Sequence, residues 1–206
     1  MNALRNSQFS RRLTGLLLGL GLSGAVVLGV PSTGTAQQRL PGGSAGPETA
    51  RLVRVIDADT YDLLMSGRVE RVRLVGVDAP ELSQPFGPQA ADSVRRLLPV
   101  GQLVQLTRAS GKPDLYGRTL GALRLAAGTT PRTPHPMAVD SLLVVRGWAW
   151  AWEPGRTTPR LAAAQTQAQS AGRGLWKCGT AEPVPPHVWR GFTSRIKRLY
   201  WGGCPW

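Results

Sequence analysis

The sequence predicts an α+β fold in which five short strands form a small barrel or a curled sheet, and three helices separate or follow the strands. Two observations predict this fold class. Runs of alternating, β-branched residues recur at hairpin spacing from residue 51 onwards. Between and after these runs lie three segments with the apolar spacing, the N-terminal capping residue or the alanine content of helices.

The strands are expected to begin as a meander. A Ser-Gly turn at residues 66–67 separates the second strand from the third. The five expected strands cover residues 51–56, 61–65, 68–77, 102–107 and 118–125. The three expected helices cover residues 88–98, residues 140–146 with Asp140 as the N-cap, and residues 158–171. Residues 129–136 hold three prolines and are expected to form a loop.

Residues 1–36 have the composition of an export signal. A positive start is followed by an apolar run over residues 13–30, and small residues before Gln37 offer a cleavage site. Retention of the same segment as a membrane anchor is the alternative. Residues 37–49 are rich in Gly, Pro, Ser and Gln and are expected to form a flexible linker. We therefore expect an exported protein, periplasmic or extracellular, with membrane association through this segment left open.

The chain is strongly basic. Its 206 residues carry a formal net charge of +13 at pH 7. A charge of this size attracts polyanions, of which nucleic acid comes first and anionic lipid second. Residues 188–200 interleave aromatic and basic residues, with Val188, Phe192, Ile196 and Leu199 on one helical face. A helix docked on the domain is favoured here, and binding to nucleic acid or to an anionic membrane are the alternatives.

Cysteine and histidine are scarce. Cys178 and Cys204 are the two cysteines, and an even pair on an exported chain predicts a disulfide that acts as a structural staple. Its reduction is expected to lower thermal stability and to leave the chemistry unchanged. The two histidines, His135 and His187, stand next to prolines and away from any expected nucleophile or metal cluster. Histidine-based hydrolysis and zinc hydrolysis are therefore disfavoured, and a general base has to be a carboxylate.

Four of the 12 acidic residues lie close together in the sequence. Asp57 and Asp59 share one face of an extended segment. Asp78 stands at the end of the third expected strand, and Glu81 follows across an Ala-Pro turn. If the strands pair as a meander, these strand ends meet. Two carboxylates, a backbone carbonyl and waters would then form an oxygen-only site for a cation such as calcium.

Two arginines complete this set. Arg73 lies within the acidic window, and Arg118 opens the last expected strand. Guanidinium groups bind phosphate oxygens and stabilise the charge of a phosphoryl group in transfer, while a carboxylate such as Glu81 can take a proton from water. Each residue alone is explained as well by a turn cap or an exposed charge. The set as a whole favours metal-assisted phosphoryl chemistry.

Residues 55–176 resemble the staphylococcal (thermo)nuclease family. The resemblance is carried, in order, by Asp57-Ala58-Asp59-Thr60, by Arg73-Leu74 with Asp78-Ala79-Pro80-Glu81, by Asp114-Leu115-Tyr116-Gly117-Arg118, and by the later Gly147-Trp148-Ala149 and Gly174-Leu175-Trp176. It implies an OB-type five-stranded β-barrel with three helices. It also implies calcium-dependent hydrolysis of phosphodiester bonds in DNA and RNA, with little sequence specificity and with 3′-phosphate ends left behind.

The resemblance also implies roles for the site residues. Asp59 and Asp78 would bind Ca²⁺ together with the backbone carbonyl of Ala79, and Asp57 would shape the site from outside the metal's own ligands. Ala58 replaces the glycine that is usual in the family.

The remaining roles concern water and substrate. Glu81 would act on the attacking water, as its base or as the group that orients it. Arg73 and Arg118 would hold the phosphate and its transition state, and Tyr116 would line the nucleotide pocket.

On this basis, the nuclease domain is expected at residues 50–177. Residues 178–206 form a basic, aromatic extension that has no counterpart in the family and is expected to be tied by the disulfide. The protein is expected to act as a monomer on DNA and RNA. The main alternative is a non-catalytic OB-fold protein that binds nucleic acid. A membrane-associated structural protein is a third reading, which leaves the acidic cluster unexplained.

Overall fold

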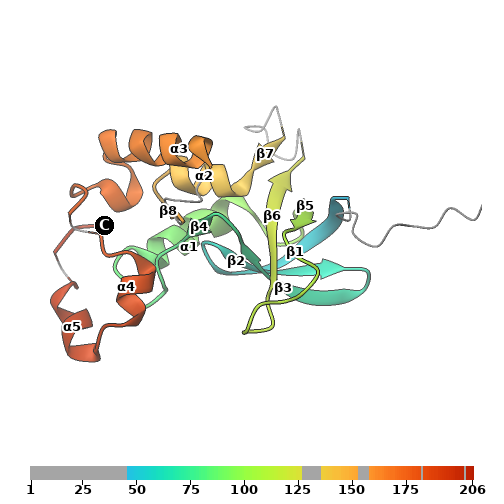
Figure 1. Ribbon diagram of the computed structural model, residues 1–206, viewed down its shortest axis with the longest axis horizontal. Coiled ribbons are helices and arrows are strands. Elements are labelled where there is room, and N and C mark those ends of the chain that lie inside the picture. The colour runs from blue at the N-terminus through green and yellow to red at the C-terminus, as the bar shows by residue number, and fades with distance from the viewer. Residues whose placement is uncertain (1–45, 127–135, 153–157, 182, 202) are drawn as a thin grey trace, which may run out of the picture. The chain divides into compact units, whose positions relative to one another are not determined.

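The computed structural model shows a closed, mixed β-barrel of five strands (Figure 1). The strands are β1 (Glu48–Asp57), β2 (Thr60–Met65), β3 (Arg68–Leu74), β5 (Leu103–Arg108) and β6 (Thr119–Leu125). Antiparallel pairing gives the order β3-β2-β1-β5-β6, and a parallel pairing between β3 and β6 closes the barrel. The short strand β7 (Met137–Ala138) pairs with β6. The OB-type α+β fold is therefore confirmed, although β1 begins at Glu48, within the segment expected to be a linker.

The structure describes residues 46–126, 136–152, 158–181, 183–201 and 203–206. The expected export segment at residues 1–36, most of the linker and nearly all of the expected loop at residues 129–136 lie outside these ranges. Among the helices in these ranges, none has both the length and the apolar composition needed to cross a bilayer.

The turn between β2 and β3 fixes the first hairpin. Met65 pairs with Arg68, so two residues connect the strands. Ser66 and Gly67 both have positive φ, 47° and 79°. Two-residue hairpins favour this geometry because its twist matches that of the strands. The predicted Ser-Gly turn therefore sets the register that carries Arg73 to the far end of β3.

The expected strand at residues 68–77 is split in two. β3 ends at Leu74, and Gly76 follows with φ of 80°. Beyond this glycine, β4 (Val77–Asp78) leaves the barrel and pairs with β8 (Trp150–Ala151). A positive φ breaks the extended backbone, which is why one continuous strand was the wrong expectation. Asp78 is consequently held by a pairing outside the barrel.

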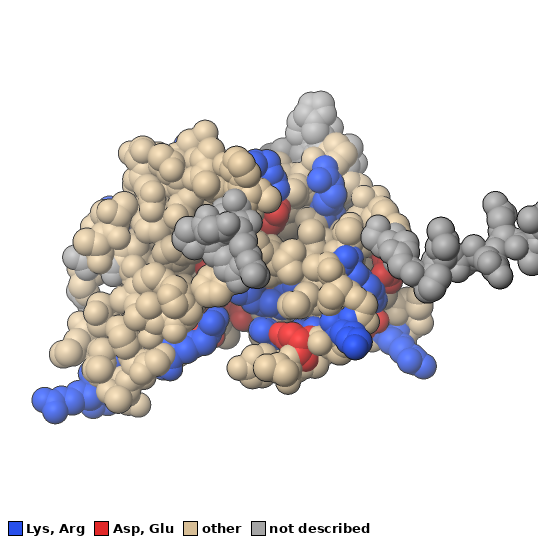
Figure 2. Space-filling model, viewed as in Figure 1, with Lys and Arg blue, Asp and Glu red and all other residues tan. Residues whose placement is uncertain are grey.

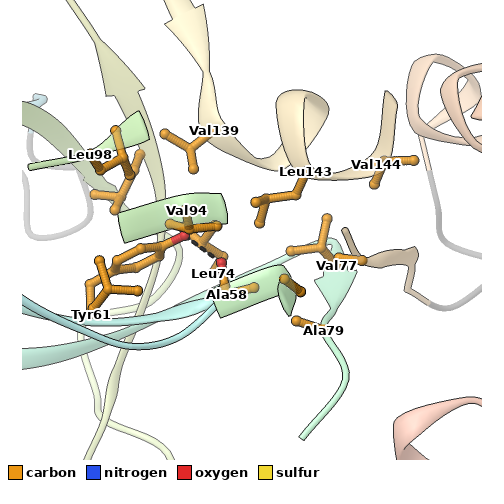
Figure 3. Packing of buried hydrophobic residues seen from close by; sticks show 14 of the residues in the cluster. Ala58, Tyr61, Leu74, Val77, Ala79, Val94, Leu98, Val139, Leu143 and Val144 are labelled. Carbon is orange, nitrogen blue, oxygen red and sulfur yellow. Dashed lines mark hydrogen bonds between the residues drawn. The ribbon is translucent and has the colours of Figure 1, made fainter. Parts of the chain in front are cut away.

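Three helices lie close to their predicted positions: α1 (Gly87–Leu97), α2 (Val139–Val145) and α3 (Pro159–Ser170). α1 packs against β1, and α2 packs against both β6 and α3. Val94 of α1 and Leu143 of α2 belong to the same buried cluster as Tyr61 and Leu74 of the barrel (Figure 3). The Tyr61 hydroxyl donates a hydrogen bond to the carbonyl of Ala58 at 2.5 Å (Figure 3). The core thereby fixes the turn that follows β1.

Asp140 is not the N-cap of α2, contrary to the prediction. The N-cap is Ala138, and Asp140 lies in the first turn of the helix. There its carboxylate accepts a hydrogen bond from the amide of Ser141 and pairs with Arg160 of α3 at 3.3 Å. The carboxylate therefore links α2 to α3, at a position that also suits the positive end of the helix dipole.

The C-terminal extension forms two short helices, α4 (Pro186–Arg190) and α5 (Ser194–Leu199), after the 3₁₀ turn η1 (Gly174–Trp176). The single helical face expected across residues 188–200 is wrong, because α4 ends at Arg190, with Gly191 as its C-cap, and the Thr193 side chain caps a new helix. A Cys178–Cys204 disulfide encloses both helices, as predicted. The rings of Phe86 and Trp206 lie 5.4 Å apart, so the end of the chain is docked on the domain.

Candidate active site

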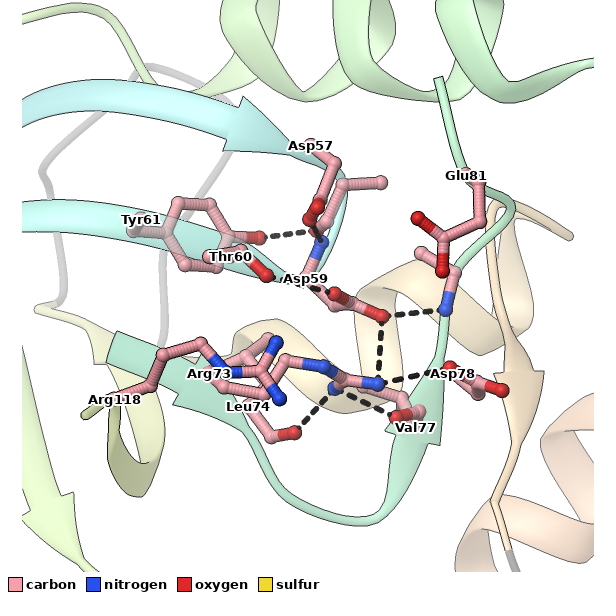
Figure 4. Close-up of polar contacts among 12 residues, drawn as sticks. Asp57, Asp59, Thr60, Tyr61, Arg73, Leu74, Val77, Asp78, Glu81 and Arg118 are labelled. Carbon is pink, nitrogen blue, oxygen red and sulfur yellow. Dashed lines mark hydrogen bonds and ion pairs between the residues drawn. The ribbon is translucent and has the colours of Figure 1, made fainter. Parts of the chain in front are cut away.

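The predicted site residues converge on one cleft, although they come from separate parts of the chain (Figure 4). The cleft has a volume of about 700 Å³. Every residue assigned a role from the sequence lines it: Asp57, Asp59, Arg73, Asp78, Ala79, Glu81, Tyr116 and Arg118. Asp57, Arg73 and Asp78 belong to β1, β3 and β4, and the other five residues lie in the turns and loops next to β1, β4 and β6. The structure thus brings together groups that the sequence placed near predicted turns.

The turn after β1 presents the first two carboxylates. The amide of Asp59 donates to Asp57 Oδ1 at 3.1 Å, so Asp57 stabilises the turn that carries Asp59. Ala58, fully buried between them, does not adopt a positive φ. The alanine therefore meets no left-handed strain at this position.

Arg73 is the organising side chain of the cleft. Its side chain is only 13% exposed. One guanidinium nitrogen donates to the carbonyls of Leu74 at 2.6 Å and Val77 at 2.9 Å. The other lies 2.9 Å from Asp78 Oδ1 and 3.1 Å from Asp59 Oδ2 (Figure 4). A single arginine therefore fixes the turn between β3 and β4 and bridges both carboxylates.

Asp59 and Asp78 are buried, with side chains 5% and 2% exposed. Burial raises the pKa of both carboxyl groups, that of Asp59 well above its ordinary value, while the Arg73 guanidinium acts in the opposite direction. Asp59 Oδ2 accepts a hydrogen bond from the amide of Ala79. Asp78 Oδ2 is buried and has no hydrogen-bond partner among the described residues. One oxygen of a buried carboxylate is thus left without a compensating contact.

These groups fit a hard divalent cation. A cation that prefers oxygen ligands would contact the unpartnered carboxylate oxygen. It would also offset the free-energy cost of burying the two carboxyl groups. Over the ranges that the structure describes, no group of three or more His, Cys, Asp or Glu side chains is placed to hold a metal. The predicted set has two carboxylates and one backbone carbonyl, so substrate or water oxygens would have to complete it.

Tyr116 and Arg118 form one rim of the cleft. Asp114 accepts hydrogen bonds from the amides of both residues, at 2.9 Å each, and its Oδ2 lies 2.7 Å from a guanidinium nitrogen of Arg118. The Arg118 guanidinium lies 5.1 Å from the centre of the Tyr116 ring, which is itself exposed. The Asp-x-Tyr-Gly-Arg turn therefore presents an arginine and an aromatic face side by side.

Arg190 is a cleft residue that the sequence did not predict. It belongs to α4 of the extension, and its Nε donates to Glu81 Oε1 at 2.7 Å. A second guanidinium nitrogen donates to Asp78 Oδ1 at 3.1 Å. In the sequence it is one of several basic residues in the extension, and no local spacing distinguishes it from the others.

Comparison with known proteins agrees with this geometry. The family model described as "Staphylococcal nuclease homologue" matches residues 71–178. An uncharacterized endonuclease of Escherichia coli is 38% identical over 140 residues, which cover 68% of this chain and 83% of the relative. A micrococcal nuclease of Shigella flexneri is 34% identical, over 68% of this chain and 78% of the relative.

A third relative, a thermonuclease of Staphylococcus hyicus, is 31% identical over 142 residues, which cover 65% of this chain and 78% of the relative. The matched family segment begins within β3 and includes Arg73, Asp78, Glu81 and Arg118. The chain belongs to the family of staphylococcal nuclease homologues.

Proposed function

We propose that the protein is a calcium-dependent nuclease that hydrolyses phosphodiester bonds in DNA and RNA with little sequence specificity, leaving 3′-phosphate ends. The family and its named nuclease relatives support a hydrolase of the staphylococcal nuclease type, with nucleic acid as substrate. The observation that carries the proposal is the bridge that Arg73 makes between Asp59 and Asp78, in the cleft that also holds Glu81 and Arg118.

The calcium ion would be held by Asp59, Asp78 and the carbonyl of Ala79, with Asp57 supporting the turn behind them. When bound, a divalent cation neutralises charge on a non-bridging phosphate oxygen. The buried, partly uncompensated carboxylates support this assignment, because they are costly without a cation.

The chain's own residues then carry the chemistry. Glu81 would orient a water molecule or accept its proton as the water oxygen attacks phosphorus. As the new O–P bond forms, the bond from phosphorus to the 5′ oxygen breaks. That oxygen takes up a proton and leaves as the 5′-hydroxyl, and the phosphate stays on the 3′ side. Arg73 and Arg118 would stabilise the charge that develops on the phosphate oxygens.

The surroundings of the cleft suit a polyanion of variable sequence. On the face shown in Figure 2, most visible charged atoms belong to Lys and Arg, with acidic atoms in small groups among them. The formal charge of the chain is +13. Tyr116 exposes 83% of its surface at the rim, where it would stack on bases irrespective of their identity. Charge and stacking favour strand binding without readout of sequence.

Plasmid DNA, single-stranded DNA and RNA should each be incubated with the protein in calcium, in magnesium and in chelator. We expect cleavage in calcium, and sequencing of the products should give 3′-phosphate ends. Glu81→Gln should lose cleavage by about 10²-fold or more while still binding the strand. Retention of the strand without cleavage, by the wild-type protein in calcium, would instead establish the non-catalytic binding protein.

We further propose that the protein is exported and monomeric, and that retention of residues 1–36 would attach it to a membrane. The disulfide supports an oxidising compartment, because such bonds are rare in reducing ones. Fractionation of cells that express the full chain, with the mass of the exported product, tests whether residues 1–36 are removed or retained. Light scattering of the purified product tests for a monomer.

A further inference from the structure

Arg190 of the C-terminal extension directly contacts two acidic residues of the cleft. It contacts Glu81 and Asp78, residues that precede it by 109 and 112 positions. Its side chain is 51% exposed, whereas that of Asp78 is 2% exposed. The guanidinium therefore covers the buried carboxylate on one side and faces the open cleft on the other.

The extension is built to hold this arginine in place. The neighbouring residue Trp189 is fully buried, and its indole nitrogen lies 3.4 Å from Ser83 Oγ, close to Glu81 in the chain. The side-chain amide nitrogen of Gln84 donates to the backbone carbonyl of Val184. The ammonium of Lys197 lies 5.3 Å from the centre of the Trp189 ring. Packing, hydrogen bonds and the enclosing disulfide thus all restrict α4.

We propose that Arg190 is a third active-site arginine, supplied by the extension, which positions Glu81 and binds the substrate phosphate. This inference rests on the proposed function of the same cleft. Nε fixes Glu81 Oε1, which limits the rotation of the carboxylate that acts on water. Five N–H donors are available on a guanidinium, and the two contacts in the structure use two of them. The remaining donors can reach a phosphate oxygen from the exposed side.

The charge of the cleft supports a role in substrate binding. Four carboxylates and three guanidinium groups line it, so its formal charge is −1. A bound divalent cation makes the formal charge +1, which suits an anionic phosphodiester. Without Arg190 the same cleft would be neutral after the cation binds. The extension therefore supplies the charge that makes the loaded cleft attractive to its substrate.

The contact with Asp78 leaves room for a cation. Arg190 and Arg73 both donate to Asp78 Oδ1, whereas Oδ2 has no hydrogen-bond partner among the described residues. An arginine on one oxygen and a cation on the other are compatible, since carboxylates accept up to four contacts. Arg190 is accordingly assigned to the working site, not to a blocked form of it.

The first test compares Arg190→Ala and Arg190→Lys with the matched control Arg195→Ala, which removes an exposed arginine from the same extension. Cleavage of single-stranded DNA is measured in calcium. We expect kcat/KM to fall by about 10- to 100-fold in Arg190→Ala, in line with the loss of a preorganised donor. Arg190→Lys should keep part of the kcat/KM that Arg190→Ala loses, because lysine retains the positive charge but lacks the paired N–H donors of a guanidinium. The control should stay within about twofold of wild type.

Binding is measured separately, in chelator, by fluorescence anisotropy of a labelled oligonucleotide. Arg190→Ala should weaken binding, and its log–log salt slope should be smaller by about 0.7, the value for one lost contact to a single strand. Equal kinetics and equal binding in Arg190→Ala and wild type would overturn the inference, and so would faster cleavage by Arg190→Ala. A wild-type protein that binds but does not cleave would instead refute the proposed function, while the binding arm still tests Arg190.

The second test concerns the extension as a support. From the sequence, reduction of Cys178–Cys204 is expected to spare the chemistry, but a role of Arg190 in the cleft predicts the opposite, because the disulfide encloses Arg190. Reductant, or the double substitution Cys178→Ser and Cys204→Ser, should lower kcat when Arg190 is present. In the Arg190→Ala background the same treatments should cause little further loss of kcat. Assays run well below the melting temperature of each variant keep unfolding out of the comparison. An equal loss in both backgrounds would show that the disulfide does not act through Arg190, and would overturn this arm.

Discussion

At the scale of single residues, Arg73 stabilises the two carboxylates that are buried in the cleft. Both Asp59 and Asp78 lose hydration on folding, and Arg73 is the guanidinium that contacts both. We predict that Arg73→Ala lowers the free energy of unfolding by about 3 kcal/mol in chelator, because it removes the partner of buried charges. Urea denaturation at pH 7 measures this effect.

Arg118→Ala is the matched control, since Arg118 lines the same cleft but pairs with Asp114 at the rim. It should cost at most about 1 kcal/mol, as expected for a partly exposed ion pair. If the two variants unfold at the same urea concentration, Arg73 does not carry the stabilising role that its contacts suggest.

Asp62 gives a second prediction at this scale, away from the cleft. Its carboxylate lies 2.8 Å from guanidinium nitrogens of both Arg54 and Arg71. The hydrogen bonds from Arg71, more than any other cause, hold the pKa of Asp62 below its ordinary value. A lowered pKa adds stability above the unfolded pKa, near 3.9, and this stability is lost as the pH falls through the folded pKa.

We therefore predict that Asp62→Asn lowers the free energy of unfolding by about 1 kcal/mol at pH 7, a value discounted because both arginines are exposed. The difference from wild type should shrink as the pH falls below about 4. Urea denaturation at pH 7, 5 and 3 provides the measurement. A difference that is constant across this range would mean that the ion pairs do not contribute.

At the scale of elements, two glycines fix how the segment after α2 meets the segment after α3. A Cβ at Gly147 would lie 2.1 Å from the carbonyl oxygen of Arg173, and one at Gly174 would lie 2.3 Å from that of Gly147. Both glycines have positive φ, and the amide of Leu175 donates to the carbonyl of Gly147 at 2.8 Å. This crossing leads straight into β8, which pairs with Asp78 of β4.

We predict that Gly147→Ala destabilises the fold by about 2–4 kcal/mol, because it combines a backbone clash with a left-handed conformation. Activity should also fall at temperatures where the variant stays folded, since β8 supports Asp78. Thermal denaturation and cleavage assays measure the two effects. Gly111→Ala is the control, because nothing lies within 4 Å of its added Cβ. Equal stability of the two variants would contradict the argument.

Elements with local signals were predictable, and those that depend on distant partners were not. The hairpin at Ser66-Gly67 and the helices α1 and α3 follow from turn chemistry and residue spacing, and lie within a few residues of their expected bounds. The β4–β8 pairing and the parallel closure between β3 and β6 join segments far apart in the chain. No local pattern specifies such pairings, because they are selected by packing of the whole core.

The site divides in the same way. Its acidic motif and Arg73 were recognisable, because scarce carboxylates cluster within a short stretch of a basic chain. Arg190 was not, because it is one basic residue among several in the extension and reaches Glu81 only after the extension docks. A residue that reaches the site only through tertiary packing cannot be recognised from the spacing of residues in the sequence.

At the scale of the whole molecule, the extension is held at several points against the segment between β4 and α1. Trp189 is buried against the segment that follows β4, and Trp206 packs on Phe86. The ammonium of Lys177 donates to the carbonyl of Pro205, beside the disulfide. Apolar burial and the covalent link therefore act together, and stability should depend on both.

The last prediction follows from the loop that the disulfide closes. Cys178 and Cys204 are 26 positions apart. Closing a loop of this length lowers the conformational entropy of the unfolded chain, which adds about 3 kcal/mol to the free energy of unfolding. For a chain of this size, that loss should lower the melting temperature by about 6–12 °C on reduction. Calorimetry with and without reductant measures the shift, and the variant with Cys178→Ser and Cys204→Ser should melt at the lower temperature in both conditions. An unchanged melting temperature in reductant would mean that apolar docking alone holds the extension, since a covalent restraint that stabilises the fold cannot be removed without cost.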